Sequence, residues 1–164
     1  MFLEPSVIYE TADFVAVNKP AGLLVHRIKL KMENGERGME PTLVDWLLKK
    51  YPEIKNVGDD PKNRPGIVHR LDKDTSGVIL IARNQKFFEY LKNLFQNHQI
   101  KKTYLALVYG KLQSKTGVIE KPIALKSGSL KRTVRISDKV RMVKEAVTEY
   151  KVKKFLSIQG EVFS

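Results

Sequence analysis

The stretch Arg64-Pro-Gly-Ile-Val-His-Arg-Leu-Asp-Lys-Asp-Thr-Ser-Gly-Val-Ile-Leu-Ile-Ala-Arg83 determines how we interpret the rest of the chain. The apolar pair 67–68 leads into the polar run 69–72, and after a turn-like Asp-Thr-Ser-Gly tetrad comes the apolar run 78–82. This pattern predicts a strand, a short polar loop and a buried strand. A polar loop held between two pieces of core is how a fold fixes a reacting group. The alternative, from spacing alone, is that Asp72 pairs with the arginine two positions before it or caps the turn.

Length and composition indicate one globular domain. The chain has 164 residues, of which 42% are hydrophobic and 29% charged, which is typical of a globular protein. No apolar run reaches transmembrane length, and the first five residues, Met-Phe-Leu-Glu-Pro, are too short and too acidic for a signal peptide. The absence of cysteine excludes disulfides, thiol catalysis and cysteine-ligated metals, and it is compatible with the cytoplasm.

The charge balance points to a polyanionic partner. The net charge is +12, from 30 Lys and Arg against 18 Asp and Glu. Nucleic acid is the first candidate. An anionic membrane surface is the second, but no strongly amphipathic basic helix supports it. A generally lysine-rich proteome would give the same balance without any such partner.

The first half of the chain reads as a hairpin, a loop and a helix. Residues 6–10 and 14–17 are β-rich runs separated by a turn, and a loop containing Pro and Gly follows. A capping-box-like start at 42–45 predicts a helix that ends before Pro52. Trp46 lies on the apolar face of that helix, so we assign it to the core.

The second half reads as one helix followed by strands. Apolar residues at helical spacing predict a helix over 85–98, and alternating patterns predict strands over 101–110, 117–125 and 144–155. The basic loop 126–135 either contacts phosphates or is simply solvated. Short strands, several in hairpins, with two clear helices predict an α+β fold with a mixed, mainly antiparallel sheet flanked by helices.

No pattern in the sequence predicts a metal or a cofactor. The adjacent pair Asp59 and Asp60 has no further ligands at suitable spacing, and His26, His69 and His98 show no zinc spacing. There is also no glycine motif for a bound nucleotide. We therefore expect neither a metal nor a cofactor.

The nine residues His69-Arg-Leu-Asp-x-x-Thr-Ser-Gly77 match the signature of the RluA-type pseudouridine synthases, which isomerise uridines in structured RNA. Three further segments resemble the same family in the same order. They are VNKPAGLLVH at 17–26, KKTYLALVYG at 101–110 and KEAVTEYKV at 144–152. The resemblance implies the pseudouridine synthase fold, with an RNA cleft across the sheet and no cofactor.

The resemblance also implies roles for the residues of the central motif. Asp72 corresponds to the catalytic carboxylate. Arg70 enters the space left by the flipped base or contacts RNA beside it, and His69 supports that geometry.

Four residues outside the central motif are implied to lie at the same site. Tyr104 corresponds to the tyrosine that stacks on the target base, and Lys102 to a lysine in the RNA-facing wall. Lys19 and His26 correspond to residues of the first motif, which borders the cleft, and are expected near RNA phosphate.

By resemblance, residues 1–164 form the front part of a catalytic domain that is incomplete at its C-terminus. The sequence contains no Thr-Gly-Arg-x-His-Gln-Ile-Arg-like segment, whose arginine pairs with the catalytic aspartate in the family. No room precedes the first strand for an S4 RNA-binding domain. The chain stops at Phe163-Ser164, in what looks like the start of another strand, and this favours a fragment over a truncated gene product or an incomplete enzyme.

The leading hypothesis is an RNA pseudouridine synthase acting on ribosomal or transfer RNA. We expect it to be a cytoplasmic monomer that does not bind membranes. The first alternative is a non-catalytic RNA-binding module derived from the same fold, and the second is a basic structural protein of a ribonucleoprotein. Of these three, only the enzyme needs Asp72 for its activity.

Overall fold

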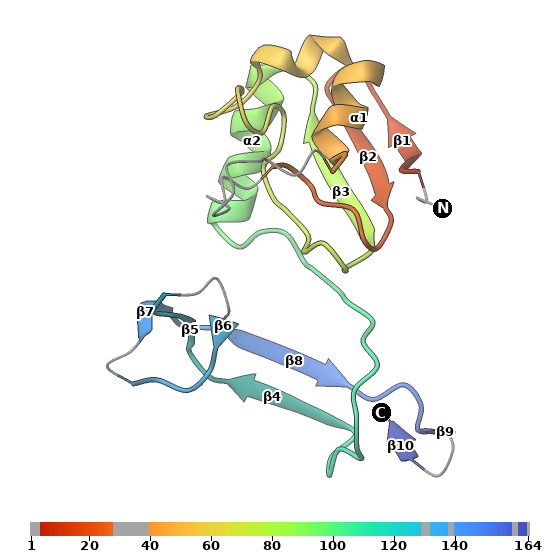
Figure 1. The fold of residues 1–164 in the computed structure, drawn as a ribbon, viewed down its shortest axis with the longest axis vertical. Coiled ribbons are helices and arrows are strands. Elements are labelled where there is room, and N and C mark those ends of the chain that lie inside the picture. Colours follow the sequence, from red (N-terminus) through yellow and green to blue (C-terminus); the bar gives the residue numbers. More distant parts are fainter. Residues whose placement is uncertain (1–3, 28–39, 129–131, 138–139, 159–160, 164) are drawn as a thin grey trace. The chain divides into compact units, whose positions relative to one another are not determined.

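The computed structural model describes residues 4–27, 40–128, 132–137, 140–158 and 161–163. The chain divides into two compact units (Figure 1). Unit 1 is Met1–Lys102 and unit 2 is Thr103–Ser164. Each unit is described separately.

Unit 1 contains a three-stranded antiparallel sheet with the order β1-β2-β3 (Figure 1). Its strands are β1 (Ser6–Glu10), β2 (Phe14–Lys19) and β3 (Gly77–Ala82). β1 and β2 pair as the predicted hairpin. The β2–β3 ladder runs from Phe14 opposite Ala82 to Lys19 opposite Gly77. The ends of β2 and β3 that lead into the two motif loops therefore lie side by side.

The helices of unit 1 begin where local capping chemistry allows. They are α1 (Leu43–Lys50), the short 3₁₀ helix η1 (Pro52–Asn56) and α2 (Gln85–Gln96). The predicted capping box at α1 is confirmed, because the Thr42 hydroxyl accepts from the Asp45 N–H while the Asp45 carboxylate accepts from the Thr42 N–H. The Asn84 side chain caps α2 by accepting from the Phe87 N–H at 2.9 Å.

The core of unit 1 lies between the sheet and its helices. One apolar cluster joins β2, β3, α1 and η1, and includes the buried Leu71 of the central motif. Trp46 packs against this cluster, which confirms its assignment to the core. A second cluster joins the end of β3 to Phe88 and Leu91 of α2. Leu71 thus ties the motif loop directly to the core.

Two predicted strands are wrong. Ile67 and Val68 form no strand, because Ile67 makes only an isolated bridge to Ile81 before the backbone leaves β3. Residues 101–108 have no assigned secondary structure and belong to no ladder of the described residues. Their alternating pattern satisfied the strand template, but a strand also needs a neighbour to accept and donate backbone hydrogen bonds.

Unit 2 consists of small antiparallel ladders. β4 (Thr116–Glu120) pairs with β8 (Val147–Lys151), and β9 (Leu156–Ile158) with β10 (Glu161–Phe163). β5 (Ile123–Lys126) pairs with both β6 (Arg132–Thr133) and β7 (Val140–Lys144). The predicted run 117–125 is broken at Pro122 as expected. The α+β class with mainly antiparallel pairing is confirmed, although the strands form several small sheets.

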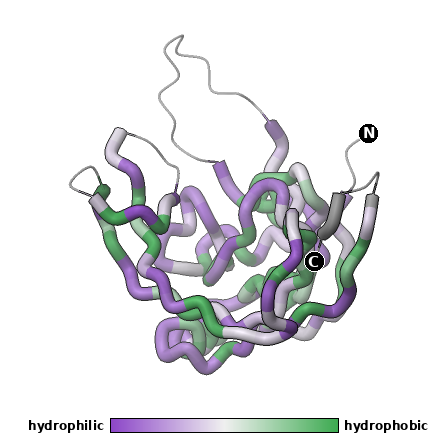
Figure 2. The backbone as a smooth tube through the Cα atoms, turned by 90° about the horizontal axis from the view of Figure 1, so that it is seen from below, coloured by the Kyte–Doolittle hydropathy of each residue, from purple (hydrophilic) through white to green (hydrophobic). Residues whose placement is uncertain are grey.

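Apolar and polar residues are interspersed along the whole described backbone (Figure 2). Among the described residues, no helix has the length and apolar character needed to cross a membrane.

Candidate active site

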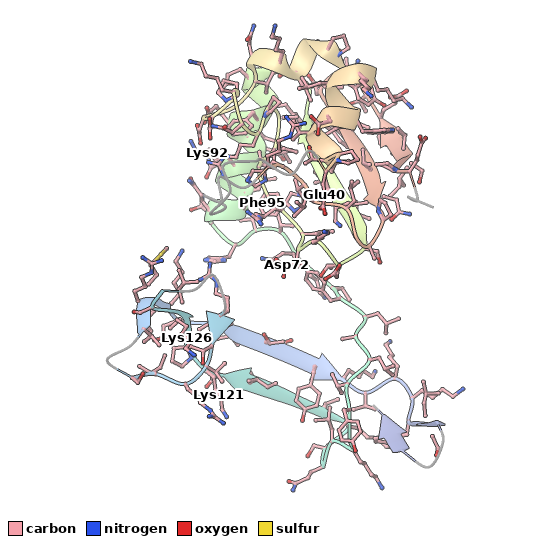
Figure 3. All side chains as sticks on the ribbon, in the orientation of Figure 1. Glu40, Asp72, Lys92, Phe95, Lys121 and Lys126 are labelled. Atoms are coloured by element: carbon pink, nitrogen blue, oxygen red, sulfur yellow. The ribbon has the colours of Figure 1, made fainter. Side chains whose placement is uncertain are left out.

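The central motif forms a loop whose alternate side chains point to core and solvent. Leu71 is buried, whereas Arg70 and Asp72 on either side of it are exposed. After Asp72 the chain turns, with the Thr75 N–H donating to the Asp72 carbonyl at 3.2 Å, and enters β3 at Gly77. Figure 3 labels Asp72 on this loop. An arginine and a carboxylate are thereby presented to solvent from a backbone that the core holds.

The Asp72 carboxylate is available to a substrate. It makes no hydrogen bond or ion pair with any residue that the structure describes. Pairing with Arg70 and capping of the turn by the side chain, the two simple structural roles for Asp72, are therefore not observed. An exposed carboxylate on a fixed loop can act as a nucleophile, a base or an electrostatic partner.

Lys19 does not occupy the place expected for a phosphate contact. Its side chain is fully buried, and its Nζ donates to the carbonyls of Pro20 at 2.8 Å, Leu23 at 2.8 Å and Lys73 at 2.9 Å. An ammonium has three N–H donors, so none remains for RNA. Burial lowers the pKa of Lys19, while the carboxylates of Asp74 and Asp72 oppose that change.

The contacts of Lys19 instead join two loops. The Lys73 carbonyl, directly after Asp72, accepts from Lys19 Nζ and also from the Gly22 N–H at 2.9 Å. Gly22 has a φ of +81°, which favours glycine. The loop after β2 is thus bonded to the loop that carries the candidate carboxylate.

His69 is half-buried, and its ring contacts β3 and α2 within unit 1. Its Nε2 accepts from the Leu80 N–H in β3 at 3.0 Å, and its ring stacks on Phe95 of α2 with centroids 4.5 Å apart and planes at 23°. Burial, with the positive charge of Lys102 as a smaller cause, lowers the pKa of His69 to about 4. The imidazole is therefore neutral at physiological pH.

His26 lies within the electrostatic influence of two arginines. Its pKa is lowered by burial first, then by the charges of Arg70 and Arg64, and raised in part by Asp60. Its Nδ1 is buried without a hydrogen-bond partner among the described residues. The charge of Arg70 in the central motif therefore acts on His26 of the first motif. The expected place of His26 near RNA phosphate stays a prediction.

The two remaining predicted residues are exposed. Lys102 is the last residue of unit 1, and its positive charge contributes to the lowered pKa of His69. Tyr104 belongs to unit 2, and 63% of its surface is exposed. Unit 1 thus holds all the predicted site residues other than Tyr104.

The described residues contain no group of three or more His, Asp or Glu arranged to hold a metal ion. The expected absence of metal and cofactor stays a prediction.

Sequence reasoning missed two groups that hold the motif loop in place. Phe95 is one of the apolar residues at helical spacing that predicted the helix over 85–98, and in the structure its ring also stacks on that of His69. The Lys73 carbonyl receives two donors, and a backbone carbonyl has no signature in a sequence. Stacking of Phe95 on a particular partner likewise requires the fold.

Comparison with known proteins identifies the family. The family model described as RNA pseudouridylate synthase matches residues 13–160. The ribosomal large subunit pseudouridine synthase D of Borreliella burgdorferi is 35% identical over 147 residues, which cover 90% of this chain and 42% of that protein. An uncharacterized RNA pseudouridine synthase of Aquifex aeolicus is 39% identical over 150 residues, which cover 91% of this chain and 43% of that protein.

Solved structures agree on the fold. The human RNA pseudouridylate synthase domain containing 1 has a TM-score of 0.71 at 24% identity, covering 98% of this chain and 56% of that one. The human RNA pseudouridylate synthase domain containing 4 has a TM-score of 0.63 at 25% identity, covering 96% of this chain and 56% of that one. This chain spans less than half the length of the curated relatives above. With the motif that surrounds Asp72 and a family model that matches most of its length, the chain belongs to the RNA pseudouridylate synthase family, in its RluA-type branch.

Proposed function

We propose that this chain carries the catalytic carboxylate of an RNA pseudouridine synthase and that Asp72 is that carboxylate. The observation that supports the proposal is its environment. Asp72 is exposed and has no partner among the described residues, yet the loop is held by the buried Leu71 on one side and by the bonds to the Lys73 carbonyl on the other. A reacting group needs both access and a fixed position.

The reaction is an isomerisation with no net change of atoms. The bond from uracil N1 to ribose C1′ breaks, the uracil rotates, and a C5–C1′ bond forms. The C5 hydrogen leaves as a proton, and N1 gains one. Asp72 acts either as a nucleophile or electrostatic partner at C1′, or as a base that takes the C5 proton, and both roles suit an exposed carboxylate.

The uridine must leave its stack to reach Asp72. Unstacking costs a few kcal/mol. Arg70, which is exposed, fills the space or contacts the RNA beside it in this proposal. Tyr104 supplies a stacking surface for the uracil, a contact worth roughly 1–3 kcal/mol. Lys102 and His26 complete the RNA-facing set.

Ribosomal RNA is the substrate class we favour over transfer RNA. The names of the Borreliella burgdorferi and Buchnera aphidicola relatives assign those proteins to the large ribosomal subunit. The net charge of +12 suits a polyanionic substrate of either class.

The test is release of tritium from ribosomal RNA labelled at uridine C5, measured for the chain and for Asp72→Asn. Release by the unmodified chain, and none by Asp72→Asn at unchanged RNA affinity, is the expected result. Asp74→Asn is the matched control, because it removes the same charge from the same exposed loop two residues later and should keep turnover.

Tritium release by Asp72→Asn at the unmodified rate would refute the assignment of Asp72. Salt-sensitive RNA binding without release by any of the three proteins would favour the non-catalytic RNA-binding module.

A further inference from the structure

The segment before Asp72 runs along the outer edge of β3. β3 pairs with β2 on its other side, so its outer N–H groups need separate acceptors. The Ala82 N–H donates to the Gly66 carbonyl at 2.9 Å, and Ile67 bridges to Ile81. Gly66 and Ile67 therefore cover this edge through one hydrogen bond and one isolated bridge, without forming a strand.

At Leu80 the imidazole of His69, and not a backbone carbonyl, is the hydrogen-bond acceptor at this edge of β3. The N–H groups of residues 80 and 82 point to the same side of an extended strand. The first donates to His69 Nε2 at 3.0 Å, where a continuing strand would have offered a carbonyl. The side chain thus satisfies the sheet edge while the backbone leaves β3 toward Arg70 and Asp72.

The His69 ring is held on its face as well as at its edge. It stacks on Phe95 of α2 with centroids 4.5 Å apart. The Nε2 lone pair must be unprotonated to accept from Leu80, and burial with the nearby Lys102 charge keeps it so by lowering the His69 pKa. An imidazolium at this place would set a donor against a donor.

We propose that His69 is a positioning residue: its ring, held between the Leu80 N–H and Phe95, sets how far the Arg70–Asp72 segment stands from β3. This inference rests on the proposed function of Asp72. It assigns His69 an indirect role in turnover, through the placement of the carboxylate, and no direct contact with RNA.

Two substitutions distinguish the role of His69 as a hydrogen-bond acceptor from its role as a stacked ring. His69→Phe keeps an aromatic ring against Phe95 but leaves the Leu80 N–H without an acceptor. His69→Gln loses the ring but places an amide oxygen near the position of Nε2. Turnover and RNA affinity are measured for both variants, and amide hydrogen exchange at Leu80 reports on the bond itself. Trp46 fluorescence verifies that unit 1 is folded.

We expect His69→Phe to lower kcat by about 10- to 100-fold, the range for a carboxylate displaced by an ångström or less, with RNA affinity unchanged. Leu80 exchange should accelerate in the same variant, and His69→Gln should restore both properties most of the way. Rescue by an acceptor of different shape is a result that general loss of packing does not produce.

Three results would overturn the inference. They are wild-type kcat in His69→Phe, equal Leu80 exchange in both variants, and a loss of RNA affinity with kcat unchanged, which would make His69 an RNA contact. If the unmodified chain releases no tritium, the proposed function fails, whereas Leu80 exchange in the two variants still decides whether His69 holds the edge of β3.

Discussion

Replacing Lys19 with methionine tests whether this lysine belongs to the fold or to the RNA surface. Methionine keeps the length and apolar stem but removes the ammonium. The Lys73 carbonyl would still accept from the Gly22 N–H, so the carbonyls of Pro20 and Leu23 are the two that lose their recorded donor. A buried carbonyl without a donor costs about 1–3 kcal/mol. The expected loss of unfolding free energy is therefore about 2 to 4 kcal/mol, after allowing for the relief of burying a charge.

The assay is urea unfolding followed by the fluorescence of Trp46, the single tryptophan, which packs against the core of unit 1. Lys73→Met is the matched control. The Lys73 side chain is 43% exposed and bonds Glu40 at 2.8 Å on the surface, so the same chemical change there should leave the midpoint unmoved.

Unfolding of Lys19→Met at the same urea concentration as the unmodified chain would refute the structural role of Lys19. Weaker RNA binding at unchanged stability would refute it as well, because that result would return Lys19 to the phosphate-contacting role expected from sequence. A loss of stability accompanied by slower tritium release is what the bond to the Lys73 carbonyl predicts.

Three further outcomes are expected. Because the pKa of His69 is about 4 in the fold and 6.5 in an unfolded chain, the unfolded state binds more protons between these values. Unfolding free energy is then lost as pH falls through this window, by about 3 kcal/mol in total, and an equal acid dependence in His69→Gln would contradict this. Gly66→Ala places a Cβ 2.6 Å from the Ala82 carbonyl oxygen at a φ of +68°, so it should lower the free energy of unfolding by more than Gly22→Ala does. Gly22→Ala, at +81° with nothing within 4 Å, should cost only the conformational 1–2 kcal/mol or so; equal urea midpoints would refute the contact at Gly66. Tyr104→Ala should weaken binding of single-stranded uridine RNA by about 1–3 kcal/mol in a titration while Tyr104→Phe does not, and equal affinities would remove its stacking role.

Much of the local structure could be predicted because its causes lie within a few residues. The capping box of α1 needs only Thr42 and Asp45, three positions apart. The hairpin 6–19 needs two β-rich runs and a turn. The motif around Asp72 also identified the family without any structure, because its residue types and spacing are themselves the signal.

The roles of Lys19 and His69 were decided only by tertiary structure. A lysine near a glycine loop reads as an exposed cation, yet its ammonium reaches a carbonyl 54 residues away. The resemblance gave the histidine of the central motif only a supporting place beside Arg70, whereas the structure shows that it accepts from a strand N–H 11 residues later and stacks on α2. Backbone carbonyls and N–H groups are the same at every residue type, so no side-chain pattern marks which of them a buried group will meet. The sequence by itself therefore determined the family, the carboxylate candidate and the local elements. Only the packing of distant segments decided which polar side chains hold the Asp72 loop and which stay exposed.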